Sequence, residues 1–253
     1  MIGVGIGYQQ EACFACSFCT QGIEQLCANQ KVIAVDRYGG LADHIVVDSR
    51  FAFRLSPQLD SATSTPLLSS GLTVYAGILR AQLPGGSRVA VLGAGGLGHL
   101  AIQFLHKSGH SVTAFSHSPR KRGLIERLGA AFVDSSDLRH LTEGHEAFDF
   151  IISTLNVAFD LDAFVRMLTP QGQLCLVASP VEQLSLSGGQ LNNSRRSIYG
   201  SYIGSRSETV QMLEFAATHG IQAVVEVMPL ARVNEAIERI RTRDVEMGLV
   251  LAS

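Results

Sequence analysis

Apolar residues downstream of about position 66 fall into short continuous runs that alternate with segments of helical periodicity. The runs predict strands, because buried parallel strands are apolar on both faces, and glycine or proline bounds most of them. The alternation predicts βαβ units and a parallel sheet covered by helices on both faces. The predicted strands are 87–93, 110–116, 131–134, 148–154, 172–180 and 197–204, and the predicted helices are 96–109, 119–129, 157–168 and 208–220.

The two ends of the chain show a different pattern. Residues up to about Pro57 contain β-branched pieces at 31–36 and 41–49, between turn signals such as Tyr38-Gly39-Gly40, and no long helical pattern. We expect the C-terminal tail to pack back onto this first region. The tail is predicted to form a strand at 222–228, a helix at 231–243 and a strand at 247–252.

Composition narrows the class of protein. A chain of 253 residues with 46% hydrophobic and 17% charged residues can bury a substantial core. A net charge of −2 without a long basic run gives no reason to expect a nucleic-acid partner. No stretch approaches the about twenty apolar residues of a membrane span, and the first residues lack a signal-peptide pattern. We therefore expect a cytoplasmic protein without a membrane partner, where thiols stay reduced.

Four of the five cysteines, Cys13, Cys16, Cys19 and Cys27, lie within fifteen residues. Closely spaced thiolates on a turning backbone supply the tetrahedral ligands that zinc prefers. Four protein ligands leave no position for water or substrate, so the predicted zinc is structural. Two disulfides or unrelated buried thiols are the alternative interpretation. The fifth cysteine, Cys175, lies in an apolar strand and is predicted to be a core thiol.

A glycine-rich turn follows the predicted strand 87–93 and opens the predicted helix 96–109. Gly93 permits the tight turn, Gly95 lets a pyrophosphate approach the backbone, and Gly98 lets the helix pack on the strand. The free N–H groups of the helix N-terminus favour phosphate. In this context the motif predicts a Rossmann dinucleotide site rather than an ordinary turn. The candidate residues are Gly93, Gly95, Gly96, Leu97 and Gly98.

The end of the second predicted strand indicates which dinucleotide is bound. No Asp or Glu occurs between Asp60 and Glu126, where an NAD site usually carries an acidic residue for the ribose hydroxyls. Instead the strand runs into Ser116-His117-Ser118-Pro119-Arg120-Lys121-Arg122. Hydroxyls and cations favour a 2′-phosphate. The segment predicts NADP(H), and a solvated basic helix start is the alternative.

Several segments resemble zinc-dependent medium-chain alcohol dehydrogenases, especially the cinnamyl-alcohol-dehydrogenase-like branch with its NADP-dependent aldehyde reductases. The similarity runs nearly end to end. It includes the cysteine loop, YGGLADHIVVDSRFAFRLS, TPLLSSGLTVYAGIL, VAVLGAGGLGHLAIQF, DFIISTLNVAFDLDAFVRMLTPQGQLCLVASP and SRRSIYGSYIGSRSETVQMLEFAATHGI.

The resemblance implies an α/β fold of two domains. A GroES-like, β-rich domain would be formed by residues 1–65 and 221–253, and a Rossmann domain by 66–220. It also implies that the four clustered cysteines bind the family's structural zinc and that the substrate is a small alcohol or aldehyde. Because members of the family often dimerise, it further implies a possible homodimer. The residues implied to contact the cofactor are Ser116, Ser118 and Lys121 at the 2′-phosphate, Thr73 near the nicotinamide, and Thr154, Val177 and Ser201 along the cleft.

The departures from the family pattern concern its catalytic zinc. Ser69 stands where the family carries a ligand cysteine, and a serine hydroxyl is a weak ligand for zinc. The other ligands lie in a family segment that would precede Met1, so we expect an N-terminally truncated family member. The histidines do not rebuild the site: His99 and His117 are expected to be polar surface residues or phosphate neighbours.

Three functional interpretations stay open at this stage. The family implies hydride transfer between NADP(H) and a primary alcohol or aldehyde, assisted by a zinc Lewis acid. The missing ligands predict that this activity is impaired in this chain, and no catalytic residue is identified. The alternatives are a non-catalytic, NADP(H)-binding protein with a structural zinc, and a truncated gene product.

Overall fold

The computed structural model describes residues 4–136, 147–242 and 244–252 of the chain. It contains two compact units. Unit 2 is Thr73–Tyr202, and unit 1 consists of the residues up to Leu72 together with those from Ile203 onward. The helix α3 (Ser70–Ala81) crosses the boundary between the units. Within the described residues, no helix combines the length and the apolarity that a bilayer span requires.

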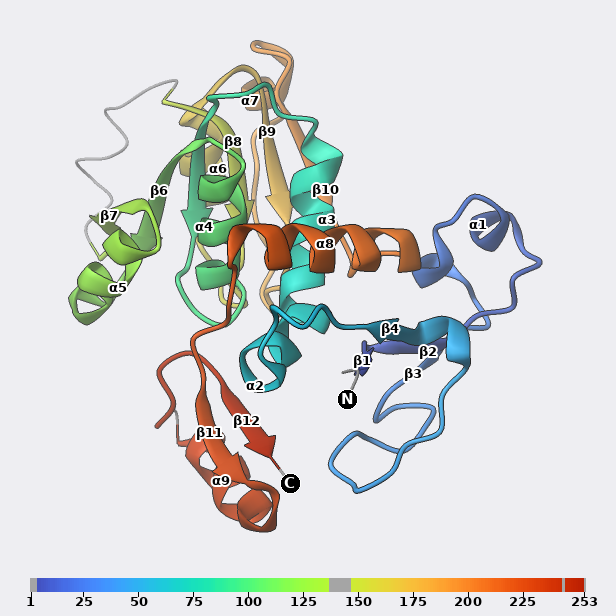
Figure 1. Ribbon diagram of the computed structural model, residues 1–253. Helices are drawn as coiled ribbons and strands as arrows, with labels where there is room; N and C mark the ends of the chain where they lie inside the picture. The colour runs from blue at the N-terminus through green and yellow to red at the C-terminus, as the bar shows by residue number, and fades with distance from the viewer. Residues whose placement is uncertain (1–3, 137–146, 243, 253) are drawn as a thin grey trace. The chain divides into compact units, whose positions relative to one another are not determined.

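Unit 2 is built on one parallel sheet (Figure 1), whose six strands have the order β10-β9-β8-β5-β6-β7 in the described part of the chain. Every neighbouring pair is parallel. The order reverses at β5, so β5 to β7 extend to one side and β8 to β10 to the other. This is the doubly wound Rossmann arrangement that the alternating pattern predicts. The strands are β5 (Arg88–Leu92), β6 (Ser111–Ser116), β7 (Ala130–Asp134), β8 (Phe148–Ser153), β9 (Leu168–Leu176) and β10 (Ser197–Gly200).

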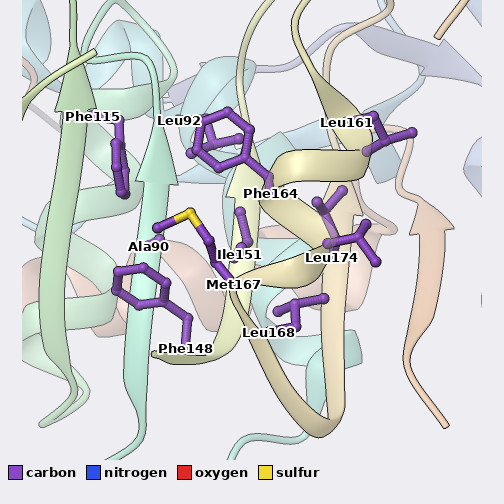
Figure 2. Packing of buried hydrophobic residues seen from close by; sticks show 11 residues of the cluster. Ala90, Leu92, Phe115, Phe148, Ile151, Leu161, Phe164, Met167, Leu168 and Leu174 are labelled. Atoms are coloured by element: carbon purple, nitrogen blue, oxygen red, sulfur yellow. The ribbon is translucent and has the colours of Figure 1, made fainter. Parts of the chain in front are cut away.

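Both faces of the sheet are covered, and the central strand β5 is apolar and buried on both faces after Arg88. Val89 to Leu92 of β5 have no exposed surface. On one face, Phe164 and Met167 from α6 and the turn after it pack over Ala90, Ile151 and neighbouring side chains (Figure 2). On the other face, Phe104 of α4 stacks on Tyr75 of α3 with ring centroids 5.2 Å apart. The helices that cover the sheet or connect its strands are α4 (Gly98–Lys107), α5 (Arg122–Arg127), α6 (Leu161–Arg166) and α7 (Gly188–Asn192).

The helix predicted at 157–168 is shorter than its pattern suggested. Asp160 caps α6 by accepting a hydrogen bond from the amide of Ala163 (2.9 Å), so the helix begins at Leu161. It ends at Arg166, and β9 begins two residues later. The strand predicted at 197–204 is also shorter and ends at Gly200. The predictions at 96–109 and 110–116 are confirmed within two residues at each end.

Unit 1 contains three separate two-stranded sheets within the described residues, pairing β1 with β4, β2 with β3 and β11 with β12. The predicted strand, helix and strand of the tail are confirmed as β11, α9 and β12, and the helix predicted at 208–220 as α8. The elements of unit 1 are β1 (Val4–Ile6), β2 (Gln9–Glu11), α1 (Ser17–Thr20), β3 (Lys31–Val32), β4 (Ala52–Arg54), α2 (Ser61–Ser64), α8 (Arg206–His219), β11 (Glu226–Pro229), α9 (Val233–Arg241) and β12 (Leu249–Ala252).

The predictions of β structure at 31–36 and 41–49 are wrong for most of these residues. Only Lys31–Val32 forms a strand, and the structure assigns none to 41–48. β-Branched residues favour a strand only where a partner strand supplies hydrogen bonds and a packing face. Among the described residues, segment 41–48 has no such partner, and Val46 is 92% exposed.

Candidate cofactor and metal sites

The four clustered cysteines converge in unit 1, with all four Sγ atoms within 4.8 Å of one another. The Sγ atoms of Cys13 and Cys19 are 3.9 Å apart. A tetrahedral zinc–thiolate site with bonds of about 2.3 Å has sulfur–sulfur edges of about 3.8 Å, whereas a disulfide needs about 2.05 Å. All four thiols are free. The donor set and its spacing fit a zinc ion, and the alternative of paired disulfides does not match the structure.

Backbone amides prepare this loop for thiolates. The amide of Cys16 donates to Cys13 Sγ (3.3 Å), and the amide of Cys13 donates to Cys27 Sγ (3.5 Å). Hydrogen bonds from the backbones of Ala15 and Cys16 lower the pKa of the Cys13 thiol to about 6. Burial raises the pKa of Cys19 to about 12. A metal ion would bind all four sulfurs as thiolates, because its charge outweighs such differences.

Aromatic and cationic side chains hold the cysteine loop within unit 1. Phe14 has a left-handed backbone (φ 54°), and the Arg50 guanidinium lies 3.6 Å from its ring centroid. Arg206 at the start of α8 donates to the Arg50 carbonyl (2.8 Å) and lies 3.5 Å from Glu24, which is in the same loop. The side-chain amide of Gln9 also donates to the Glu24 carbonyl (2.8 Å). The loop is therefore anchored to three other segments of its unit, which contain Gln9, Arg50 and Arg206.

The residues do not fit a second metal ion in the described part of the chain. Ser69 follows the 3₁₀ helix Thr65–Leu68 with an exposed side chain, and its amide donates to the Pro66 carbonyl (3.3 Å). Within residues 4–136, 147–242 and 244–252, the cysteine group is the only one in which three or more His, Cys, Asp or Glu ligand atoms lie close enough to share an ion.

The predicted cofactor residues all belong to unit 2, and most of them follow the carboxyl ends of its strands. The strand ladder continues one residue past each end: the amide of Gly93 donates to the Phe115 carbonyl, Thr154 to Leu92, Val177 to Ser153 and Ser201 to Leu176, at 2.9–3.1 Å. These residues therefore form a row along one edge of the sheet. This edge is where doubly wound sheets bind ligands, on both sides of the point where the strand order reverses.

The glycine turn has the geometry that a dinucleotide requires. Gly93 has φ +88°, which favours glycine, and a Cβ at Gly98 would lie 1.8 Å from the Gly93 carbonyl oxygen. A Cβ at Gly95 would meet no atom within 4 Å. The turn is thus tight at Gly93 and Gly98 and open at Gly95, which fits a pyrophosphate approaching there. Gly96 and Leu97 complete the turn before α4 begins at Gly98.

Ser116, Ser118 and Lys121 lie together beside this turn. Ser116 ends β6 with 4% of its surface exposed, and its hydroxyl accepts a hydrogen bond from the Ser118 amide (3.3 Å). The 3₁₀ helix Pro119–Lys121 turns the chain so that Lys121 Nζ donates to the Ala94 carbonyl (3.1 Å). A lysine and two hydroxyl side chains next to a phosphate-binding turn fit a 2′-phosphate.

Thr73 lies one helical turn before Gly77 on α3, so the two residues share a face of the helix. A Cβ at Gly77 would contact Val177 and Ser201 at 3.1 and 3.5 Å, which shows that this face of α3 approaches the ends of β9 and β10. The Tyr199 hydroxyl donates to the Gly77 carbonyl (2.8 Å) and secures the helix there.

Two features of the cofactor region differ from the sequence expectation. His99 is only 2% exposed, which excludes the surface position among its two expected roles and leaves a position beside the turn: its Nδ1 is 2.9 Å from the Gly95 carbonyl oxygen. Burial lowers the pKa of His99.

Asp134, which the sequence pattern did not indicate, pairs in register with Ser116 from the neighbouring strand. The carboxylate accepts hydrogen bonds from the amide and hydroxyl of Ser136 (2.9 and 2.6 Å). Cys175 is fully buried, as predicted.

Comparison with known proteins connects both sites to one family. A family model described as zinc-binding dehydrogenase matches residues 96–218. The probable formaldehyde dehydrogenase AdhA of Bacillus subtilis is 38% identical over 257 residues, covering 98% of this chain and 74% of the relative. The aldehyde reductase AdhA of Synechocystis is 35% identical over 250 residues, with the same two coverages.

Solved structures agree with these relatives. A cinnamyl alcohol dehydrogenase of Sorghum bicolor superposes with a TM-score of 0.90 at 33% identity, and a cinnamyl alcohol dehydrogenase of Helicobacter pylori complexed with NADP(H) superposes with 0.87 at 28%. In both cases the match covers 98% of this chain and 74% of the other. The chain thus spans about three quarters of the length of these relatives. It belongs to the zinc-dependent medium-chain alcohol dehydrogenase family, in the branch that contains the cinnamyl alcohol dehydrogenases.

Proposed function

We propose that this chain binds NADP(H) at the carboxyl edge of the unit 2 sheet and one zinc ion in the cysteine loop. We further propose that hydride transfer between NADP(H) and a primary alcohol or aldehyde is impaired in this chain. The observation that carries the proposal is the row of candidate residues after β5, β6, β8, β9 and β10, together with one metal-ligand group in the described residues. Relatives named as an aldehyde reductase and an NADP-dependent alcohol dehydrogenase support it.

The chain's own residues have distinct roles in this proposal. The N–H groups at the start of α4 bind the pyrophosphate, while Ser116, Ser118 and Lys121 bind the 2′-phosphate. Thr154, Val177 and Ser201 line the cleft, and Thr73 approaches the nicotinamide. When bound, the nicotinamide supplies or accepts the hydride. The proposed domains are 1–65 with 221–253, GroES-like, and 66–220, Rossmann.

The cysteine loop supplies no chemistry to the reaction. Cys13, Cys16, Cys19 and Cys27 complete a tetrahedral coordination sphere, so zinc held there would stabilise the loop and leave no position for a substrate oxygen. Activation of the carbonyl by a metal needs a second ligand set, which the described residues do not provide. Cofactor binding and zinc binding are therefore expected without efficient turnover.

Three measurements on the same preparation test the proposal. Metal analysis should give one zinc per chain. Titration should show NADPH binding about tenfold or more tighter than NADH, because charge-assisted hydrogen bonds to the 2′-phosphate add to binding. NADPH oxidation with a panel of aldehydes should be slow. Two zinc ions per chain with rapid, chelator-sensitive turnover would overturn the proposed impairment, and equal affinity for NADH and NADPH would overturn the cofactor assignment.

A further inference from the structure

Every carbonyl oxygen of the turn Leu92–Gly95 lies within hydrogen-bond distance of a side-chain donor, and the Leu92 and Gly93 oxygens share the single hydroxyl hydrogen of Thr154. The Thr154 hydroxyl lies 2.9 Å from the Leu92 oxygen and 3.2 Å from the Gly93 oxygen. Lys121 Nζ lies 3.1 Å from the Ala94 oxygen, and His99 Nδ1 lies 2.9 Å from the Gly95 oxygen. The donors come from three different segments: the residue after β8, the 3₁₀ helix after β6, and α4.

These contacts engage the negative ends of the turn's peptide groups. Carbonyl oxygens carry partial negative charge and repel phosphate, whereas N–H groups attract it. Donors bound to the carbonyl oxygens therefore reduce that repulsion and hold the peptide groups of the turn in place. The space at Gly95, where a Cβ would meet nothing within 4 Å, is open to a phosphate. A turn held in this way is already ordered when the cofactor arrives, so binding orders fewer groups.

Each donor suits its position. Since a carbonyl oxygen can only accept, His99 must carry its proton on Nδ1, and a neutral imidazole in that tautomer can donate it. The Thr154 hydroxyl lies within reach of two carbonyl oxygens. Lys121 has three N–H donors, and one of them contacts the Ala94 oxygen.

We propose that Thr154, His99 and Lys121 are positioning residues of the dinucleotide turn, and that Lys121 thereby couples recognition of the 2′-phosphate to binding of the pyrophosphate. This inference rests on the proposed binding of NADP(H). It differs from the assignment of Lys121 as a 2′-phosphate ligand alone in one measurable way. A simple ligand of the 2′-phosphate contributes nothing to NADH, which lacks that group, whereas a residue that positions the turn contributes to both cofactors.

The test is a comparison of dissociation constants for NADPH and NADH, measured by calorimetry on the full chain. Lys121→Met should weaken NADH by about fivefold, because a hydrogen bond from a charged donor is lost from the turn, and NADPH by about fiftyfold, because the phosphate contact is lost as well. Ser118→Ala should weaken NADPH and leave NADH within about twofold. Lys107→Met, which removes an exposed lysine at the end of α4, is the matched control and should change neither cofactor by more than about twofold.

Thr154 provides an independent arm, because its hydroxyl lies within hydrogen-bond distance of the Leu92 and Gly93 carbonyl oxygens. Thr154→Val removes the hydroxyl at nearly constant volume and should weaken NADPH and NADH by the same factor, about tenfold, while Thr154→Ser should restore most of the loss. A role in general stability alone would instead lower the melting temperature without this rescue of affinity.

The outcomes separate the coupling from the proposed function. If Lys121→Met leaves the affinity for NADH unchanged, the coupling is wrong, while its effect on NADPH still reports the 2′-phosphate contact. If the unmodified chain binds NADH as tightly as NADPH, the cofactor assignment fails, but the loss of NADH affinity in Lys121→Met and Thr154→Val still tests the turn. If Lys121→Met lowers the melting temperature, Lys121→Gln, which keeps a neutral donor, replaces it: weaker NADH binding supports the coupling, and unchanged binding overturns it.

Discussion

The two units of the molecule satisfy the hydrogen-bonding groups of their backbones in different ways. In unit 2 the strands form one continuous parallel ladder, in which β9 alone has nine residues and Val89 to Leu92 of β5 are fully buried. In unit 1 no strand of the described residues exceeds four residues, and each pairs with a single partner. Unit 2 therefore buries its apolar side chains over one regular sheet, whereas unit 1 has only short paired strands within the described residues and relies more on contacts between side chains and loops.

Buried polar groups show the same contrast. Within the described residues, buried side-chain atoms without a hydrogen-bond partner occur in unit 1 at Gln10, Glu24, Gln25 and Gln30, and in unit 2 at His110. Each such group costs about 1–3 kcal/mol of folding free energy when it is left unsatisfied. The cysteine group and the contacts of Phe14 with Arg50 and Arg206 are among the features that oppose this cost in unit 1. The comparison predicts that the stability of unit 1 depends on a bound metal ion and that the stability of unit 2 depends on the volume of its apolar side chains.

The largest expected effect is loss of the metal from unit 1. Cys27 is 1% exposed and its sulfur accepts the Cys13 amide, so Cys27→Ser should abolish tight zinc binding. A structural zinc site contributes on the order of 10 kcal/mol to the folding of its segment. Hydrogen exchange should therefore become fast in peptides covering 13–32, while peptides from β5 and β8 stay protected. Cys175→Ala is the control and should retain one zinc per chain. Undiminished zinc content in Cys27→Ser would contradict the assignment.

The second prediction concerns the apolar core of unit 2. Phe164 is 3% exposed and packs edge-on against Phe115, with ring centroids 5.4 Å apart (Figure 2). Phe164→Ala should lower the free energy of unfolding by about 3–5 kcal/mol, as measured by urea denaturation, because it leaves a cavity. Phe18→Ala in unit 1 removes a ring that is 42% exposed and should change the free energy of unfolding by no more than about 0.5 kcal/mol. A loss from Phe164→Ala no larger than that from Phe18→Ala would contradict the packing of Phe164 in the core of unit 2.

The same difference explains what could be predicted from the sequence. The strands of unit 2 are recognisable because a buried parallel strand is apolar throughout, and the glycine turn is recognisable because Gly93 and Gly98 have no sterically acceptable substitute. In unit 1 the segment 41–48 has the β-branched composition of a strand but not the partner, and composition cannot reveal a partner.

The candidate site divides along similar lines. The cysteine spacing predicts the group that converges in space, whereas only the family resemblance implied Thr154, Val177 and Ser201, which lie along the sheet edge. The roles of Thr154 and Lys121 on the turn could not be predicted, because both depend on long-range contacts, 61 or 62 residues apart for Thr154 and 27 for Lys121. The position of Asp134 beside Ser116 depends on strand register, which a single strand pattern does not contain.

A third prediction concerns the two consecutive glutamines of β2. Gln10 is 1% exposed and both polar atoms of its amide lack a partner, whereas the amide of Gln9 donates to the Glu24 carbonyl at 2.8 Å. Gln10→Leu should raise the free energy of unfolding by about 1–2 kcal/mol, because it removes the unsatisfied group. Gln9→Leu is the matched variant and should lower it by about 1 kcal/mol or more. Destabilisation by Gln10→Leu would reveal a bound water or another partner at Gln10 and weaken the contrast between the units.

The smallest expected effect tests whether helix capping follows one rule in both units. Ser205 caps α8 of unit 1 in a capping box, in which the Glu208 carboxylate accepts a hydrogen bond from the Ser205 amide (2.6 Å), and Asp160 caps α6 of unit 2. Since a cap satisfies the helix's own free amides, its contribution does not depend on the surrounding sheet. Ser205→Ala and Asp160→Ala should each lower the free energy of unfolding by about 1 kcal/mol, and Ser205→Asn should be nearly neutral because asparagine is an equally good cap. Equal losses of stability from Ser205→Ala and Asp160→Ala would mean that the units differ in their strands, buried polar groups and metal binding but not in their helix caps. A loss of several kcal/mol from Ser205→Ala alone would mean that unit 1 depends on its helices more than on its cysteine loop.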